Sequence, residues 1–401
     1  MLKKPIWNTL AQVGGKVVTV LISLVTTAIL TRKLGVGVYG NFLLITSVFL
    51  LFDSVADFGS KVIGVREASR ETGGKRIEIY VQVAWFRLAA SLLGFLIGIG
   101  LIILWSGFAT VRWAAVVALS MISFTSMAGS LEIIFQTEMK MAVKVLMDIL
   151  FPLIFVVVLL WWPNQINLLW VFVVYLVARI ASLGLGWNLV KKIVGQIRIG
   201  CFNKKFAKSF LKETWPMGIY MLLFSGYDRA VDSVLIRQFI GPEKLAFYGL
   251  AYKIYGNLIQ PAYFFVNSIF PMMSAKETNK KSLFMKSTWL MVAGILLVAP
   301  TVYFLAPWII QVLAGNQFGE SVVILRILLV AMIFAYISHL VGFTLIAKGG
   351  QKQMLVIGII SLVVNIIGNL IAIPHFGIEG AAWVTVITEG LASVMMVMRL
   401  R

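Results

Sequence analysis

The sequence predicts an all-α, polytopic membrane protein, and three observations lead to this fold class. Of the 401 residues, 60% are hydrophobic and only 13% are charged. The mean hydropathy is +0.95. Apolar stretches of bilayer length recur from one end of the chain to the other, and a spanning helix needs about 20 such residues. Soluble globular proteins do not have this composition.

Twelve apolar stretches are long enough to cross a bilayer as helices. The first follows Lys3 and Lys4 and has no small-residue cleavage site, so we expect a retained span rather than a signal peptide. The stretches lie at 7–30, 38–60, 80–105, 112–136, 142–162, 166–189, 214–236, 246–272, 287–312, 321–346, 353–373 and 378–398.

The basic residues predict the orientation of these spans. With a cytoplasmic N-terminus, the external loops hold only Arg32, Lys33, Arg112, Arg237 and Lys244, and the other loop lysines and arginines are cytoplasmic. Basic residues near span ends resist translocation, so both termini are expected in the cytoplasm. The net charge of +19 then reflects topology and does not indicate a nucleic-acid partner.

The longest hydrophilic stretch divides the spans into six and six. It predicts an N-lobe at residues 1–190, a basic cytoplasmic linker at 191–213 and a C-lobe at 214–401. The linker carries phenylalanines among lysines, so it is expected to rest on anionic lipid, with a protein partner as the alternative. Cys201 lies in this linker and is the only cysteine, which excludes an intramolecular disulfide.

A short internal repeat supports two related halves. Residues 30–35 read LTRKLG and residues 235–241 read LIRQFIG, and each copy closes the first helix of its half. Each half has an even number of spans. The halves are therefore expected to be related by a pseudo-two-fold axis along the membrane normal, with the substrate site between them.

A polar stripe runs along the first span. Its members follow one another at intervals of three or four residues, which places them on one face of a helix. A lysine inside an apolar span normally faces a bundle interior or a watery cavity, because a charge in hydrocarbon costs several kcal/mol. The stripe is therefore predicted to line a transport pathway. Its members are Asn8, Gln12, Lys16, Thr19, Ser23 and Thr26.

Charged residues inside other spans are expected to face the same cavity. The cations are Arg87, Arg179, Arg229 and Lys253, and the acids are Asp228, Asp232 and Glu389. Their positive excess, together with Lys16, suits an anionic passenger, because arginine can grip phosphate oxygens as a fork and lysine acts as a point charge. Lys16 and Arg179 are preferred as ligands because neither has an acidic neighbour nearby in sequence.

Other interpretations remain beside these. Arg229 could pair with Asp232 one turn away as an internal brace, and Arg87 is expected to snorkel to the headgroups.

Several further polar residues are expected to have structural roles. Asp53, Asp57 and Lys61 are expected to form a solvated ladder, and Glu132 and the Lys144/Asp148 pair to be interfacial. Asn365 and Asn369 are expected to serve helix packing.

Several classes of protein are excluded or disfavoured. The sequence has no Gly-x-x-x-x-Gly-Lys-Ser/Thr loop and no His/Cys cluster, so neither ATP hydrolysis of that type nor a metal or other cofactor is expected. An embedded glycosyl or phosphoryl transferase would need paired carboxylates at the membrane surface. Only Asp53 and Asp57 come close, without a recognisable partner motif, so we expect a protein that is not an enzyme.

Short motifs along nearly the whole chain resemble the Wzx-type polysaccharide flippases of the MOP exporter superfamily. They are RKLG at 32–35 with YG at 39–40, DFG at 57–59 with VRE at 65–67, DR at 228–229 with IGPE at 240–243, FP at 270–271, KGGQK at 348–352, IP at 373–374 and GAA at 380–382. The resemblance implies a V-shaped pair of six-helix lobes in the bacterial inner membrane. Many relatives have fourteen helices, and whether this chain is a full twelve-helix member or lacks a C-terminal pair is open.

The resemblance also implies a function. The expected substrate is an undecaprenyl-diphosphate-linked oligosaccharide repeat unit, moved from the cytoplasmic to the outer leaflet by alternating access in O-antigen, capsule or other polysaccharide synthesis. Membrane lipid and other polysaccharide assembly proteins are the further expected partners. Proton or sodium coupling through Asp228, Asp232 or Glu389 and pull by product consumption both remain open. The alternative is a drug or small-cation antiporter of the same superfamily, which would need an acidic, aromatic cavity.

Overall fold

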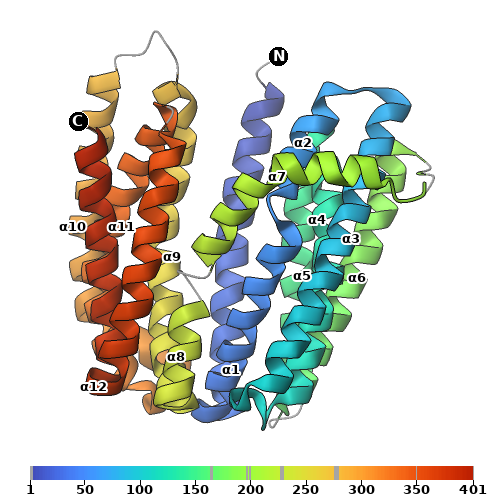
Figure 1. Cartoon of the computed structure of the whole chain (residues 1–401). Helices are drawn as coiled ribbons and strands as arrows, with labels where there is room; N and C mark the ends of the chain where they lie inside the picture. The colour runs from blue at the N-terminus through green and yellow to red at the C-terminus, as the bar shows by residue number, and fades with distance from the viewer. Residues whose placement is uncertain are drawn as a thin grey trace. The chain divides into compact units, whose positions relative to one another are not determined.

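The computed structural model describes residues 3–162, 166–195, 197, 200–225, 230–274, 280–348 and 350–400. Side chains are described from residue 14 onward, except at 220, 224, 225, 267, 268, 270–272, 274, 280, 281, 283 and 351. The described elements are all helical (Figure 1). They are α1 (Lys3–Asp57), α2 (Ser60–Arg70), α3 (Gly73–Leu104), η1 (Ser106–Phe108), α4 (Arg112–Thr137), α5 (Met141–Trp161), α6 (Leu168–Val194), α7 (Lys204–Ser225), α8 (Val231–Phe239), α9 (Pro242–Ser274), α10 (Lys280–Ala314), η3 (Asn316–Phe318), α11 (Glu320–Ala347) and α12 (Gln351–Leu400).

The all-α membrane fold class is confirmed. In the described part of the chain, eight helices are long and apolar enough to cross a bilayer. Two of them contain a break and each covers two predicted spans, so these helices account for ten of the twelve predicted spans. The predicted spans at 214–236 and 246–272 fall on α7 with α8 and on α9, which are not among these eight helices. The total of twelve stays a prediction.

The helices form two compact units. Unit 1 comprises Met1–Leu34 and Ile45–Ser225, and unit 2 comprises Gly35–Leu44 and Gly226–Arg401. The predicted linker at 191–213 therefore falls within unit 1. Residues 35–44, in the middle of α1, pack with unit 2, which the sequence did not indicate.

Glycines in the left-handed region mark the breaks. Gly35 interrupts α1 with φ 71° and ψ 174°, and Gly377 interrupts α12 with φ 60° and ψ −144°. Side chains strongly disfavour such backbone, so glycine lets the chain turn there between two helical runs. Gly241, the counterpart of Gly35 in the internal repeat, also has a positive φ, of 95°. Both copies of the repeat therefore end on a glycine with a positive φ.

The segment 35–44 is held in unit 2 by close packing. Tyr39 stacks on Phe42 and meets Phe318 edge-on, with ring centroids 6.0 Å apart in the second pair. A Cβ on Gly40 would overlap the carbonyl oxygen of Pro242, so the two backbones touch. Arg237 Nε donates to Asn41 Oδ1 at 3.2 Å.

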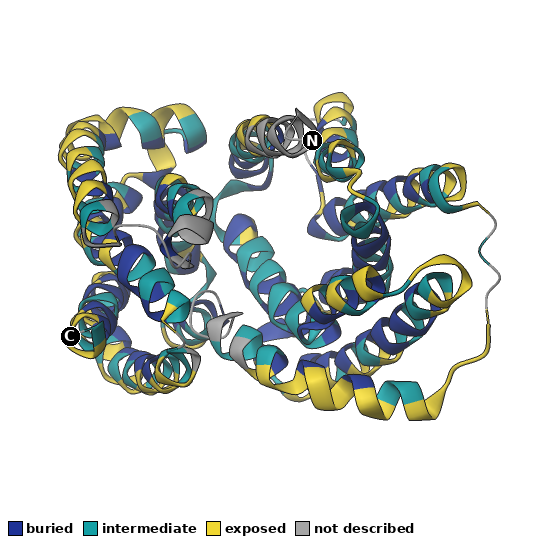
Figure 2. Ribbon diagram, turned by 90° about the horizontal axis from the view of Figure 1, so that it is seen from above, coloured by how far each residue is buried: buried dark blue, intermediate teal, exposed yellow. Residues whose placement is uncertain are grey.

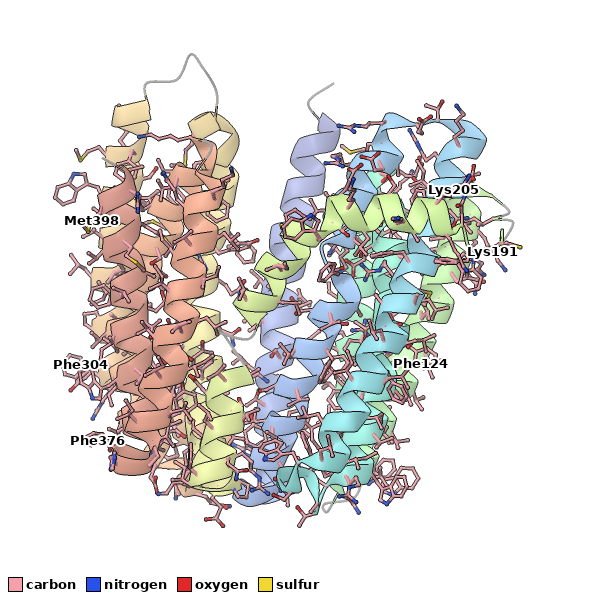
Figure 3. The ribbon with its side chains drawn as sticks, in the orientation of Figure 1. Phe124, Lys191, Lys205, Phe304, Phe376 and Met398 are labelled. Carbon is pink, nitrogen blue, oxygen red and sulfur yellow. The ribbon has the colours of Figure 1, made fainter. Side chains whose placement is uncertain are left out.

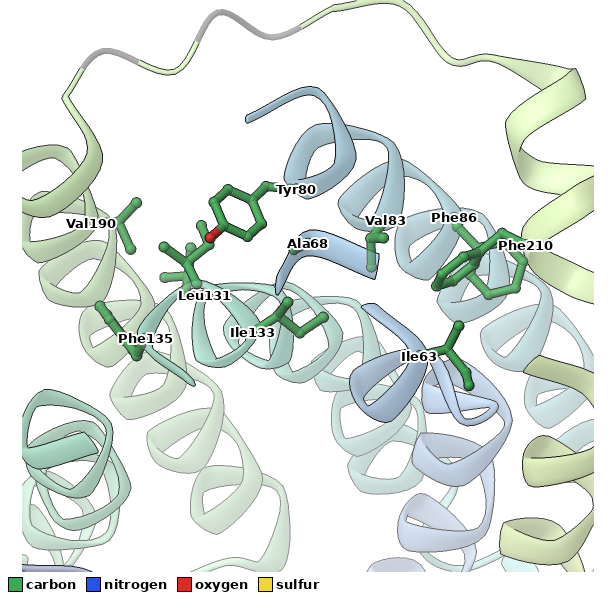
Figure 4. Close-up of a cluster of buried hydrophobic side chains, with 11 residues drawn as sticks. Ile63, Ala68, Tyr80, Val83, Phe86, Leu131, Ile133, Phe135, Val190 and Phe210 are labelled. Atoms are coloured by element: carbon green, nitrogen blue, oxygen red, sulfur yellow. The ribbon is translucent and has the colours of Figure 1, made fainter. Parts of the chain in front are cut away.

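Buried residues line the inner faces of the helices in each unit (Figure 2). In unit 1 one apolar cluster joins α2, α3, α4, α6 and α7 (Figure 4). Its members are Ile63, Ala68, Tyr80, Val83, Phe86, Leu131, Ile133, Ile134, Phe135, Val190 and Phe210. This cluster packs together the helices that carry Lys61, Arg87, Glu132 and Arg179.

Candidate functional site

Arg87 on α3 is the centre of a buried ion pair in unit 1. Its side chain is 2% exposed, and Nη1 lies 2.5 Å from Asp57 Oδ1 at the end of α1. Nη1 also donates to Ser60 Oγ at 2.6 Å, and Nε donates to the carbonyl oxygen of Ser126 at 2.9 Å. The expectation that Arg87 snorkels to the headgroups is wrong, because Asp57 meets its charge inside the protein.

Gly129 on α4 leaves the space that the guanidinium occupies. A Cβ at this position would overlap Arg87 Nη2 and would lie 2.7 Å from Lys61 Cε. Real Cβ atoms do not approach other atoms this closely, so a larger residue would displace both side chains. The pocket for Arg87 is therefore built by α1, α2, α3 and α4 together.

Lys61 belongs to a second set of ion pairs in unit 1. Lys61 Nζ lies 3.1 Å from Glu132 Oε2, and Lys144 Nζ lies 3.9 Å from the same atom and 2.7 Å from Asp148 Oδ2. The predicted Lys144/Asp148 pair is present. The expectation of a separate solvated ladder for Asp57 and Lys61 is wrong, since Asp57 pairs with Arg87 and Lys61 with Glu132.

Arg179 on α6 completes this charged group. Its Cζ lies 4.0 Å from the ring centroid of Phe151, a cation–π arrangement. Arg179 and Asp53 interact electrostatically, and Asp53 also interacts with Lys61 and Arg87. Four acids and four bases are thus linked, and we call them the unit 1 charge network: Asp53, Asp57, Glu132, Asp148, Lys61, Arg87, Lys144 and Arg179.

The charge network changes the predicted charge balance of the cavity. In the sequence analysis, Arg87 and Arg179 contributed to an uncompensated positive excess. In the structure, Arg87 pairs with Asp57 and Arg179 interacts with Asp53. The partners come from other helices, so sequence spacing could not reveal them. The local positive excess is smaller than predicted.

The polar stripe of α1 is described from residue 14 onward. Lys16 has an exposed side chain, and the half-buried Thr19 donates from Oγ1 to the carbonyl oxygen of Lys16 at 2.9 Å. Thr26 donates in the same way to Ile22 at 2.7 Å. These hydroxyls are satisfied by their own helix, so they do not require a watery surface. Ser23 is half-buried.

Part of the predicted site falls where the structure describes no side chain. Asn8 and Gln12 belong to α1, but their side chains lie outside the described ones. Asp228 and Arg229 lie outside the described residues, and so does their predicted brace. Among described residues, no group of three or more His, Cys, Asp or Glu side chains could hold a metal ion.

Asp232 on α8 anchors a buried polar group in unit 2. It is 5% exposed, Asn369 Nδ2 donates to its Oδ1 at 2.8 Å, and Tyr248 Oη donates to its Oδ2. Tyr248 Oη also lies 3.2 Å from Thr385 Oγ1. Sequence analysis identified Asp232 but missed Tyr248, which contacts it from α9, and Thr385 of α12, which contacts Tyr248. Asn369, expected to serve packing, binds the carboxylate directly.

Two amide oxygens beside this group lack hydrogen-bond partners. Asn369 Oδ1 and Asn365 Oδ1, one turn apart on α12, are buried and unsatisfied. Burying an acceptor without a donor costs about 1–3 kcal/mol, so such atoms call for an explanation. Elsewhere in unit 2, the half-buried Glu389 follows Thr385 by one turn of α12, and Lys253 is half-buried on α9.

Solved structures with the same fold are known. A MATE family multidrug transporter of the MOP superfamily, in an inward-facing conformation, has 16% identity and a TM-score of 0.78 over 94% of each chain. The lipid II flippase MurJ, in an inward closed conformation, has 14% identity and a TM-score of 0.77 over 98% of this chain and 87% of its own. A MOP superfamily transporter from Pyrococcus furiosus, described by the reversed polarity of its binding pocket, has 15% identity and a TM-score of 0.64 over 99% and 95%.

The bundles of apolar helices, one of which holds a buried ion pair, define a multi-pass membrane protein with the MOP transporter fold. Residues 2–277 match the family described as polysaccharide biosynthesis protein. The chain belongs to this family, and the resemblance to the polysaccharide flippases is confirmed. No curated protein matches the chain in sequence.

Proposed function

We propose that the chain is a flippase for polyprenyl-diphosphate-linked oligosaccharide, moving repeat units from the cytoplasmic to the outer leaflet of the bacterial inner membrane. The observation that carries the proposal is membership of a polysaccharide biosynthesis family in a chain with a MOP transporter fold. One matched structure is a lipid II flippase. A polysaccharide destined for the cell surface requires its precursor to cross the membrane, and alternating access would provide the route.

Lys16 and Arg179 are the proposed ligands of the diphosphate. Lys16 is exposed on α1, so its ammonium group can meet a phosphate as a point charge. Arg179 is half-buried, and Phe151 supports its guanidinium from one side while leaving its N–H groups for phosphate oxygens. Arg87 is proposed to position these helices rather than to contact the substrate, because its donors are engaged by Asp57, Ser60 and Ser126.

The remaining candidates are proposed to line the sugar path. Amides and hydroxyls suit sugar hydroxyls because they donate and accept hydrogen bonds. The amides and hydroxyls of this set are Asn8, Gln12, Thr19 and Ser23, and Arg229 and Lys253 are proposed as further cations of the cavity. Both termini are proposed to be cytoplasmic, and other polysaccharide assembly proteins are the proposed protein partners.

Replacing Lys16 or Arg179 by alanine tests whether these residues bind the diphosphate. K16A and R179A should each lower glycan export about 10- to 100-fold, because a hydrogen bond to a charged group contributes about 1.5–3 kcal/mol. Export is measured in cells that rely on this chain, with the amount of protein in the membrane quantified in parallel. K75A, which removes an exposed lysine at the start of α3, is the matched control. Normal export by both K16A and R179A would contradict the assignment.

Cation coupling through Asp232 is the second part of the proposal. Oxygen ligands suit hard cations, and the carboxylate of Asp232 lies beside the unsatisfied oxygen of Asn369 and near the hydroxyls of Tyr248 and Thr385. A cation there would supply the partner that Asn369 Oδ1 lacks. Asp228 and Glu389 are further proposed coupling residues.

A drug or small-cation antiporter is the remaining candidate. The pairing of Arg87 with Asp57 weakens the charge argument against it. Membership of a polysaccharide biosynthesis family favours the flippase. The two are separated by expressing the chain in a drug-sensitive strain, where a flippase leaves the inhibitory drug concentrations unchanged.

A further inference from the structure

One face of α7 is anchored in the core of unit 1. Phe210 is buried against Phe86, with ring centroids 5.1 Å apart and planes at 79° (Figure 4). Phe206 stacks on Phe210 at 5.4 Å, and Thr214, one turn further on, is fully buried. The side chains at 206, 210 and 214 therefore fix which face of α7 points inward.

The chain leading into α7 is also fixed. Gln82 Nε2 donates to the carbonyl oxygen of Cys201 at 2.9 Å, and the amide of Asn203 donates to Gln82 Oε1 at 2.9 Å. Trp85 Nε1 donates to the carbonyl oxygen of Gly200 at 2.8 Å. Asn203 Oδ1 then accepts from the amides of Lys205 and Phe206 and caps the helix. Both the start and the rotation of α7 are thus determined by α3.

The opposite face of α7 is basic and exposed. α7 runs crosswise to the other helices of unit 1, near α2 (Figure 1). Its outer side is largely exposed (Figure 2), and Figure 3 shows Lys205 and Lys191 at the same end of unit 1. Ser209, Glu213 and Pro216 are exposed elsewhere on α7, and the exposed side chains opposite Phe206 and Phe210 are Lys204, Lys205, Lys208, Leu211, Lys212, Trp215 and Ile219. We call these seven residues the α7 outer face.

The one acid of α7 does not offset the charge of this face. Glu213 is the only acid in α7, and it pairs with Arg66 of α2. Lys204, Lys208 and Lys212 follow at intervals of four, so three ammonium groups lie in one row with Lys205 beside them.

We propose that the α7 outer face binds the headgroups of anionic phospholipid. Each lysine of a basic helix on a bilayer surface adds to the attraction for anionic lipid. Tryptophan and aliphatic side chains of such a helix enter the boundary between headgroups and acyl chains. Trp215, Leu211 and Ile219 supply that second component on the same face. The inference is independent of what the protein transports, because none of these residues belongs to the proposed substrate path.

Cys201 provides a direct test. It is the only cysteine, it is exposed, and it lies just before α7, so a thiol-reactive fluorophore labels the full chain at one place. The labelled protein is reconstituted in phosphatidylcholine liposomes that contain a small fraction of a quenching lipid. The quencher carries a nitroxide near its headgroup and is phosphatidylglycerol in one preparation and phosphatidylcholine in the other. At low salt, quenching by the phosphatidylglycerol quencher should exceed quenching by the phosphatidylcholine quencher at least about fivefold. NaCl at about 0.5 M should bring the two extents of quenching close to each other, because salt screens the attraction.

Variants identify the lysines responsible. The combined variant K204Q/K205Q/K208Q/K212Q should lose the phosphatidylglycerol preference, and the corresponding Lys→Arg variant should keep it. The matched control K75Q/K140Q/K286Q/K352Q removes the same charge from exposed lysines elsewhere and should also keep it. Equal quenching by the two lipids in the wild-type protein would overturn the proposal, as would a preference that survives the Lys→Gln variant. The salt series on the wild-type protein tests the same electrostatic attraction without any substitution.

Discussion

At the scale of single residues, the charge network of unit 1 shows that a buried arginine can be a brace. Arg87 satisfies Asp57 across two helices and uses the space left by Gly129. Such a pair contributes little net stability when complete, because desolvating two charges offsets their attraction. Removing one partner is costly, since it leaves the other charge buried.

Substitution of Arg87 should therefore be severe and should be partly rescued by a second change. R87M should destabilise the protein by about 3 kcal/mol or more, because Asp57 loses its arginine, whereas R87M/D57L should be more stable than R87M. Thermal unfolding of the purified protein in detergent measures both. A double variant that loses as much as the two single variants together would show that the residues act separately.

The residues of the candidate site were only partly predictable from the sequence. Asp232 and Lys16 were identified because a charge inside an apolar span is unusual at any position. The surroundings of Asp232 were not predicted, because Tyr248 and Asn369 contact it from helices far apart in the chain, and Thr385 contacts Tyr248. The spacing of residues along a helix predicts which of them are neighbours on that helix, but it does not predict their neighbours on other helices.

At the scale of helices, Gly35 separates two predicted spans within a single element, α1. The sequence predicted two spans and a short external turn, and the helical runs were placed correctly. The structure shows that the turn is a break at one glycine, with φ 71° and ψ 174°. Hydrophobic periodicity predicts where apolar helices lie, but it carries no information about the backbone angles of a single residue.

Alanine at Gly35 should reveal the cost of this backbone conformation. Nothing lies within 4 Å of the Cβ that G35A would add, so any effect comes from the backbone and not from a clash. We expect a loss of about 1–3 kcal/mol. G184A, in the open middle of α6, should be neutral or stabilising by comparison. Equal unfolding midpoints for the two variants in detergent would show that Gly35 is not strained.

At the scale of the whole molecule, the fold class was predictable and the assignment of segments to units was not. Composition and spacing predicted an all-α membrane protein, and the family match agrees with the motifs. The placement of residues 35–44 in unit 2 depends on Tyr39, Gly40 and Asn41 meeting residues from α8, α9 and η3. Only the folded chain brings these together.

Ion coupling can be tested on the complete transporter. If Asp232 couples transport to a cation, collapsing the proton and sodium gradients in proteoliposomes should slow flipping of a lipid-linked oligosaccharide. D232N should flip slowly with or without a gradient, because the carboxylate is missing. D148N, in the unit 1 charge network, is the control and should keep its response to the gradient. Wild-type rates that do not depend on either gradient would exclude coupling.

The position of residues 35–44 has a consequence for biosynthesis. Tyr39 packs against Phe318, which is synthesised 279 residues later (318 − 39). At about 5–20 residues per second, translation needs about 15–60 s to cover that interval. During this time most of unit 1 is complete, while the middle of α1 still lacks its neighbours from unit 2. Residues 35–44 of the nascent chain therefore cannot make their contact with Phe318 until synthesis has passed residue 318.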